Sequence, residues 1–310
     1  MRYFKLLGFS AVAGLLLAAQ TVRADEPVFG FVYTTDLLPK NQIEAEQWLT
    51  WKTEKAHGSF NLLEGRNEFS YGVSDNFQLS AIAIYDWTEA RQNAVDGTTT
   101  PPEPFSAYFP APNSRFNATQ LIGVSLEGIY RVLSPYTDPV GFAVYFEPTF
   151  GNRFMEYETR AILQKNYFDD RLILAANFTW APEIRFLPPD PYADPGSVES
   201  TRNTNIETDV NVGLAASYRF APNWSAGWEF QNEREINGWA ILARSQWMGN
   251  AYYTGPTIHY GGEHFFVTLT ALEQLPWSNN YMGEPVILNG RDYDVDFEKV
   301  RVRLKLGWYF

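Results

Sequence analysis

The sequence predicts an all-β chain that forms a transmembrane, antiparallel, up-and-down β-barrel of about twelve strands. Three observations lead to this fold. Runs of about ten residues or more alternate between apolar and polar side chains, aromatic residues crowd the ends of the apolar faces, and short connections alternate strictly with the others. Because a period of two places successive side chains on opposite faces of a strand, each run has one apolar and one polar face.

Two architectures produce such strands. In a soluble sandwich the apolar faces meet in a core, whereas in an outer-membrane barrel they face lipid and the charged faces line the lumen. The length of the runs favours the barrel, because a tilted membrane strand needs about 9–11 residues. The aromatic residues, 16% of the chain, favour it as well, because barrels carry aromatic girdles at both membrane surfaces.

The N-terminus predicts export to the cell outer membrane. Two basic residues precede an apolar run over residues 6–19, and Val22 and Ala24 suit a cleavage site after Ala24. The run is shorter than the roughly 20 residues of a membrane-spanning helix, and the chain has no cysteine to carry a lipoprotein anchor. We expect a signal peptide at residues 1–24, a short periplasmic N-terminal segment at residues 25–39 and the barrel at residues 40–310.

The alternation can be followed strand by strand. From Trp224 the chain reads WSAGWEFQNERE, in which Trp224 and Trp228 share one face and Glu229 and Glu233 share the other. The same pattern recurs over residues 140–150, 172–180, 211–220 and 299–310.

The connections give the topology. Tight turns rich in Asn, Asp, Gly and Pro are expected at residues 72–76, 133–138, 167–170, 220–223 and 260–264. The other connections fall near residues 56–59, 89–117, 151–155, 186–204, 237–251 and 277–294. With a periplasmic N-terminus, every tight turn lies in the periplasm and every other connection lies outside, which is the usual asymmetry of such barrels.

The last strand is expected to close the barrel against the first. Parity places Arg301, Arg303 and Lys305 on the lumen face, and we expect them to lie opposite Glu44 and Glu46. The chain ends on LKLGWYF. Its terminal Phe310, after alternating residues, resembles the C-terminal signal by which the barrel-assembly machinery recognises outer-membrane barrels, and this machinery is an expected partner.

Three further stretches resemble a family of outer-membrane porins named for a protein encoded with the meta pathway of phenol degradation. TTDLLPKNQIEAEQW (34–48) is similar to the opening of that family, although Asn41 stands where the pattern has Gly. NEFSYGVSDNFQLSAIAI (67–84) and SYRFAPNWSAGWEF (217–230) are similar to its hairpin motif. The resemblance implies a barrel in the outer membrane and transport of small, often apolar, compounds, and it carries over no catalytic or binding residue.

Parity assigns a charged set of residues to the lumen. The expected pore-lining residues are Glu44, Glu46, Glu64, Arg66, Glu68, Glu127, Arg131, Glu147, Glu158, Arg160, Arg219, Glu229, Glu233, Glu235, Arg301, Arg303 and Lys305. Unpaired charges in a dry interior are costly, so this face must be wet or contain many ion pairs. An open lumen should prefer cations, with Glu229, Glu233 and Glu235 as its strongest uncompensated stripe.

These features predict a narrow channel or transporter for small solutes with a polar, acidic lumen. One alternative is an outer-membrane lipid hydrolase, which only the spacing of His57 and Ser59 supports. The other is a structural or surface barrel without conductance. We expect no catalytic residue and no cofactor. We also expect no metal site, because His259 and His264 lack a local cluster of carboxylates.

A barrel in the outer membrane implies particular partners. Partners are outer-membrane lipids, including lipopolysaccharide, and a small solute that the sequence does not identify. Nucleic acid is excluded, because the net charge is −12 and the chain has no basic stripe. Residues 238–247 are expected to form a short helix that either enters the barrel mouth or caps the rim.

Overall fold

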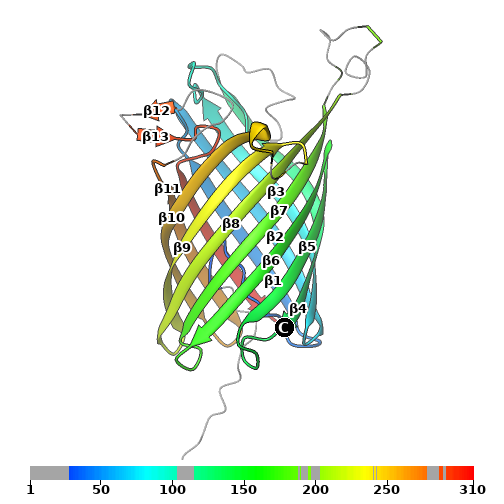
Figure 1. Ribbon diagram of the computed structural model, residues 1–310, viewed down its shortest axis with the longest axis vertical. Helices are drawn as coiled ribbons and strands as arrows, with labels where there is room; N and C mark the ends of the chain where they lie inside the picture. Colours follow the sequence, from blue (N-terminus) through cyan, green and yellow to red (C-terminus); the bar gives the residue numbers. More distant parts are fainter. Residues whose placement is uncertain are drawn as a thin grey trace, which may run out of the picture.

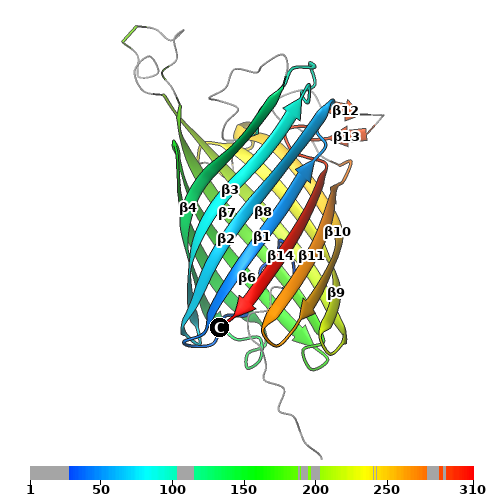
Figure 2. The ribbon, with the colours of Figure 1, turned by 180° about the vertical axis from the view of Figure 1, so that it is seen from behind.

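The computed structural model describes residues 28–102, 115–187, 189, 195–196, 203–239, 241, 243–277, 286–288 and 291–310. The expected signal peptide lies outside the described residues, as do parts of the two proline-rich connections. Strands form one closed antiparallel barrel (Figures 1 and 2), which confirms the predicted fold class. No helix among the described residues is long and apolar enough to cross a membrane.

The strands follow one another around the barrel in chain order, and the last lies between β11 and β1. The barrel strands are β1 (Ile43–Thr53), β2 (Ser59–Ser74), β3 (Phe77–Arg91), β4 (Phe116–Leu133), β5 (Gly141–Gly151), β6 (Phe154–Tyr167), β7 (Leu172–Leu187), β8 (Asn203–Ala221), β9 (Trp224–Asn237), β10 (Trp247–Gly261), β11 (Phe265–Gln274) and β14 (Val300–Tyr309). A separate hairpin of β12 (Val286–Leu288) and β13 (Arg291–Tyr293) lies between β11 and β14, and the 3₁₀ helix η1 (Arg244–Gln246) precedes β10.

The connections match the expected asymmetry. All five tight turns fall at the expected positions, and Figure 1 shows the C-terminal end of the chain at the same end of the barrel. At the other end most connections are longer, but two residues separate β5 from β6 and five separate β1 from β2, fewer than the seven between β4 and β5 at the tight-turn end. The β12–β13 hairpin falls within the expected 277–294 connection, where the sequence showed no alternation long enough to predict strands.

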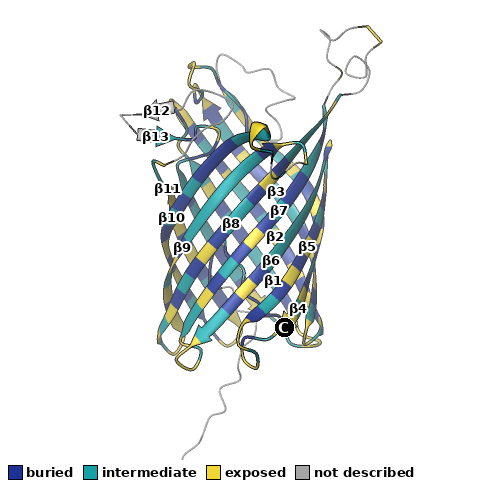
Figure 3. Cartoon of the chain, viewed as in Figure 1, coloured by how far each residue is buried: buried dark blue, intermediate teal, exposed yellow. Residues whose placement is uncertain are grey.

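The two faces of each strand differ as parity predicts. Phe69, Leu121 and Leu126 are exposed on the outside, whereas carboxylates and amides at the alternate positions are buried. On β9 the contrast is complete, since Trp228 is 55% exposed and its neighbour Glu229 is 0% exposed. Figure 3 shows the resulting alternation along the barrel wall. An apolar outside and a polar inside are the arrangement that a barrel needs in lipid.

The seam between β1 and β14 confirms one prediction and corrects another. The two strands pair, and Phe310 donates its backbone N–H to Ile43 O at 2.9 Å. The expected opposition of charges is wrong, because the register places Lys305, Arg303 and Arg301 opposite Trp48, Thr50 and Lys52. In an antiparallel pair this register leaves Glu44 beside the end of the last strand, opposite Tyr309.

The described residues of the 238–247 stretch cap the rim on the outer face of the barrel. Thr208 Oγ1 on β8 donates to Gly238 O at 2.6 Å, and the outward-facing side chain of Ile236 is fully covered. The Trp239 and Trp180 rings lie 6.3 Å apart. Among the described residues of this stretch only η1 is helical, so the expected short helix is reduced there to a single turn.

Candidate functional site

The lumen of the barrel contains the N-terminal segment. Residues 28–39, which we expected in the periplasm, lie inside the barrel, where Phe29, Leu37 and Leu38 are at most 1% exposed. The reason is that inward-facing side chains supply the hydrogen bonds that this backbone would otherwise make to water. We call residues 28–39 the luminal segment.

A single carboxylate holds the deepest part of the luminal segment. Glu229 on β9 accepts the backbone N–H groups of Gly30, Phe31 and Val32 at 2.8, 2.9 and 3.0 Å. The hydroxyl of Thr270 donates to the same carboxylate at 2.9 Å. Four donors converge on one buried acid, so the negative charge is stabilised without an ion pair at this point.

Amide side chains hold the rest of the segment. Asn177 on β7 accepts the N–H of Tyr33 at 2.6 Å and donates to the carbonyl of the same residue at 2.9 Å, as a neighbouring strand would. Gln164 on β6 accepts the N–H of Thr35 at 2.6 Å, and Gln78 on β3 accepts the N–H of Leu38 at 2.9 Å. The segment is therefore tied to strands on several sides of the barrel.

Apolar side chains of the segment occupy small, separate clusters. Val28, Phe29 and Val32 pack against Ala175 and Ala215 near the tight-turn end of β7 and β8. Leu37 packs with residues of β4, β5 and β6, and Phe31 packs with residues of β10 and β11 and with Phe297. No continuous apolar core fills the lumen, so the segment depends on polar contacts for much of its hold.

Tyr33 brings aromatic rings to the centre of the lumen. Its ring centroid lies 5.3 Å from that of Tyr145 and 6.2 Å from that of Trp48. The guanidinium carbon of Arg160 lies 4.2 Å from the Tyr33 centroid, and Lys305 Nζ lies 3.8 Å from that of Trp48. Cations thus lie on the faces of the central aromatic side chains.

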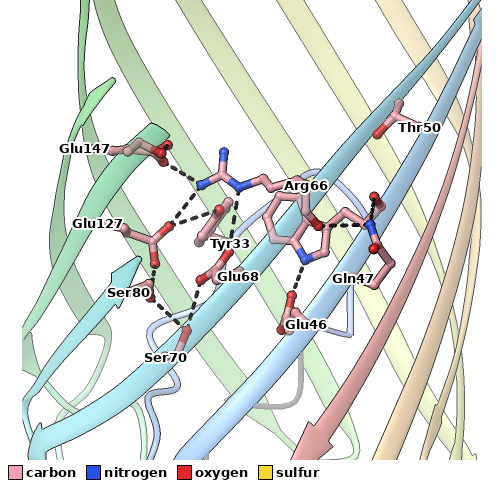
Figure 4. A network of polar contacts seen from close by, with 12 residues as sticks. Tyr33, Glu46, Gln47, Thr50, Arg66, Glu68, Ser70, Ser80, Glu127 and Glu147 are labelled. Carbon is pink, nitrogen blue, oxygen red and sulfur yellow. Dashed lines mark hydrogen bonds and ion pairs between the residues drawn. The ribbon is translucent and has the colours of Figure 1, made fainter. Parts of the chain in front are cut away.

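Arg66 is the centre of a network on β2, β4 and β5 (Figure 4). Its guanidinium lies 2.6 Å from Glu147 and 3.6 Å from each of Glu68 and Glu127. Ser80 Oγ donates to Glu127 at 3.2 Å. Three carboxylates around one guanidinium leave a local excess of negative charge in the lumen.

Ion pairs continue toward the end with the longer connections. Arg160 pairs with Glu158 at 2.5 Å, and Arg301 pairs with Glu233 and Glu298. Arg185 bridges two further acids of this end, at 2.7 Å from Glu183 and 2.5 Å from Glu207. Most of the basic side chains of the lumen are therefore engaged.

Three other acids at this end form no ion pair with any described residue. They are Glu156 on β6, Asp209 on β8 and Glu235 on β9, which we call the acidic trio. Cross-strand register places Asp209 opposite Glu235, and Glu156 opposite Glu183. Like charges on adjacent strands repel, so these acids are not stabilised by their cross-strand neighbours.

The structure places the predicted pore-lining residues as follows. Those whose side chains join the lumen networks or contact the luminal segment are Glu46, Glu64, Arg66, Glu68, Glu127, Arg131, Glu147, Glu158, Arg160, Glu229, Glu233, Arg301, Arg303 and Lys305. Glu44 is buried at the tight-turn end, and Arg219 lies at that rim, where it donates to Asp169 O at 3.2 Å. Glu235 belongs to the acidic trio.

The expected uncompensated stripe on β9 is corrected. Glu229 accepts hydrogen bonds from the luminal segment and Glu233 pairs with Arg301, so Glu235 alone of the three has neither kind of partner among the described residues. The sequence interpretation also missed lumen residues that parity identifies as inward-facing. They are Lys52, Gln78, Gln164, Asn177, Glu183, Arg185 and Glu207.

The described residues enclose a small cavity beside the luminal segment. A cavity of about 40 Å³ lies between Tyr33, Trp48, Glu68 and Lys305. A water molecule needs about 10–15 Å³ measured in this way, so the cavity holds a few waters and no larger solute.

The histidines show no catalytic or metal arrangement. His57 is exposed in the turn between β1 and β2, and no described residue forms a hydrogen bond with its side chain. His259 is buried, with Nδ1 2.8 Å from Thr268 Oγ1. No group of three or more His, Cys, Asp or Glu in the described part of the chain is placed to hold a metal ion.

The fold and the lumen define a plugged β-barrel of the outer-membrane type. A family model matches residues 21–310, and the chain belongs to that family, DUF6662, which is described as a family of unknown function. No curated protein sequence matches the chain. The resemblance to the phenol-pathway porins therefore remains a resemblance of motifs.

Solved structures are similar to this chain. The COG4313 outer membrane channel from Pseudomonas putida F1 matches with a TM-score of 0.54 and 12% identity, over 89% of this chain and 98% of that chain. The NanC porin matches with a TM-score of 0.46 and 10% identity, over 86% of this chain and 98% of that chain. The KdgM porin matches with a TM-score of 0.42 and 10% identity, over 87% and 99%.

Proposed function

We propose that this protein is an outer-membrane channel for small solutes whose lumen is closed at rest by the luminal segment. The observation that carries the proposal is the interior of the barrel. A closed barrel with an apolar outside encloses charged and amide side chains, and its interior is crossed by a segment held largely by hydrogen bonds.

The size of the barrel supports this function. Barrels of about eight strands are filled by their own side chains, whereas those of 16–18 strands leave an open channel. In this barrel of intermediate size the luminal segment takes up the space that the wall does not fill, so its departure would leave a polar path. The matched barrel from Pseudomonas putida F1 is described as an outer membrane channel, which agrees with the proposal.

The contacts of the segment explain why the closed state prevails. Leaving the lumen exposes Phe29, Phe31 and Leu37 to water, which opposes opening. The hydrogen bonds of the segment oppose opening as well, since water replaces each of them at a net cost of about 0.5–1.5 kcal/mol, or about 1.5–3 kcal/mol where the acceptor is charged. We therefore expect rare openings.

Conductance in planar lipid bilayers tests the proposal. The unmodified protein should show small or infrequent conductance, and a variant lacking residues 28–38 should show a large, steady one. The deletion spares the start of the barrel, where Asn41 donates its N–H to Gly72 O at 2.7 Å. Heat-modifiable migration on a gel checks that both proteins are folded. A folded deletion variant without conductance would overturn the proposal and favour a structural barrel.

A further inference from the structure

Two arginine side chains meet on one tryptophan at the outer rim of the barrel, beside η1. The guanidinium carbon of Arg234 lies 4.0 Å from the centroid of the Trp247 ring, and that of Arg244 lies 6.0 Å from it. The stretch between β9 and β10 also carries Trp239, which lies on Trp180 of β7. A cationic and aromatic patch thus forms on the outside of β7 to β10.

The patch faces away from the lumen. Arg234 lies on β9 between Glu233 and Glu235, which face inward, and its cross-strand partners are Val210 and Asn250. Because side chains alternate along a strand, the Arg234 side chain points to the outside. It therefore takes no part in the ion pairs of the lumen.

Neither arginine has an anionic partner in the described part of the chain. No described residue forms an ion pair or a hydrogen bond with the side chain of Arg234 or Arg244, and the Arg234 Nε atom is buried without a hydrogen-bond partner. A partly buried guanidinium without an anion is costly, and bound anions are the usual compensation. The outward-facing side of the patch thus lacks an anion to compensate its positive charge.

The height of the patch places it at the outer surface of the membrane. Arg234 follows Trp224, the first residue of β9, by ten positions. At a rise of about 3.3 Å per residue and a tilt of about 35–45°, this corresponds to roughly 25 Å along the barrel axis. The apolar band of such barrels is about 25 Å tall. If Trp224 marks the inner girdle, Arg234 lies level with the lipid head groups of the outer leaflet.

We infer that Arg234 and Arg244 bind the phosphate of a phosphorylated glycolipid in the outer leaflet, with Trp239 and Trp247 at the level of its head group. Guanidinium groups match phosphate oxygens with paired hydrogen bonds, and tryptophan side chains suit the boundary between acyl chains and head groups. The inference rests on the proposed membrane orientation and is independent of channel activity.

Native mass spectrometry of the full-length protein in detergent tests the inference. The probes are diphosphoryl lipid A and the same lipid after removal of its phosphates. The unmodified protein should bind the phosphorylated form at least about tenfold more tightly, as expected for charge-assisted hydrogen bonds. The double variant Arg234→Gln, Arg244→Gln should lose this preference and remain folded, because both side chains lie outside the lumen networks.

A matched control is Arg115→Gln. Arg115 lies beside β4, on the other side of the barrel, and pairs with Glu89 at 2.7 Å. This variant should keep the full preference for the phosphorylated lipid. Equal binding of the two lipids by the unmodified protein, or an unchanged preference in the double variant, would overturn the inference. Conductance measurements report separately on the channel proposal, so failure of one does not imply failure of the other.

Discussion

Replacing Glu229 with Gln should release the luminal segment. The carboxylate accepts three consecutive backbone N–H groups, from Gly30 to Val32, and one hydroxyl, from Thr270. An amide offers one acceptor oxygen instead of two and turns an NH₂ group toward the remaining donors. At least one buried N–H group is then left without a partner, and the other bonds lose their charge assistance.

The size of the effect follows from these contacts. A hydrogen bond to a charged group contributes about 1.5–3 kcal/mol, whereas a neutral one contributes about 0.5–1.5 kcal/mol. Losing one such bond and weakening the others should destabilise the docked state by about 2–4 kcal/mol. Since 1.4 kcal/mol is a factor of ten, the ratio of released to docked segment should rise by about 30- to 1,000-fold.

A thiol-accessibility assay measures this ratio directly. The chain has no cysteine, so Val32→Cys introduces a single thiol at a position that is 3% exposed. A membrane-impermeant maleimide then labels the thiol only when the segment leaves the lumen. Labelling in the Glu229→Gln background should be at least about 30-fold faster than with Glu229 intact, because the rate follows the population of the open state.

Glu233→Gln is the control for this assay. Glu233 lies on the same strand and the same face and loses the same charge, but it pairs with Arg301 and has no hydrogen bond to the luminal segment. Labelling in this background should stay near that of the unmodified barrel. Equal labelling rates in the two glutamine variants would refute the assignment of Glu229 as the residue that holds the segment.

Three further predictions concern selectivity, pH and assembly. In the variant that lacks residues 28–38, the reversal potential should indicate cation preference at low salt. Replacing the acidic trio with amides should move the reversal potential toward zero by more than Glu233→Gln does. Anion preference would contradict the role of the trio. Burial raises the pKa of Asp294, in the loop before β14, to about 6. Protonation of Asp294 therefore stabilises this loop. The stabilisation is complete below the unfolded pKa near 3.8 and is lost as the pH rises through about 6. The loss in free energy is at most about 3 kcal/mol. Hydrogen exchange of residues 294–299, corrected for intrinsic rates, should show less protection at about pH 7.5 than at about pH 4.5, and Asp294→Asn should remove the difference. Phe310→Ala should reduce the amount of folded protein in outer-membrane fractions much more than Phe310→Tyr, and equal amounts would count against a role of the terminal ring in assembly.

Local pattern determined the architecture. The alternation of WSAGWEFQNERE already separates Trp228 from Glu229, because neighbouring side chains of a strand must point to opposite faces. Turn chemistry at residues 167–170 and 220–223 marked where strands end, since Asn, Asp, Gly and Pro favour tight turns through their own backbone preferences. Both signals act over a few residues, so the strand order and the inward-facing set could be predicted without a structure.

Partners across the barrel were decided by the tertiary structure alone. Parity assigns Arg303 to the lumen, but the register of β1 and β14 decides that it lies opposite Thr50 and not beside Glu44. A shift of two residues keeps every side chain on its face, so the hydrophobic pattern cannot distinguish such registers. The sequence therefore could not assign ion pairs across the seam between β1 and β14.

The luminal segment is the clearest case of contacts that the sequence pattern could not predict. The sequence predicts only a short periplasmic segment at residues 25–39. The backbone of the luminal segment is buried because Glu229, 197–199 residues further along the chain, meets the N–H groups of Gly30 to Val32. The sequence alone identified Glu229 as an inward-facing acid, but only closure of the barrel brings it to a backbone that would otherwise be solvated by water.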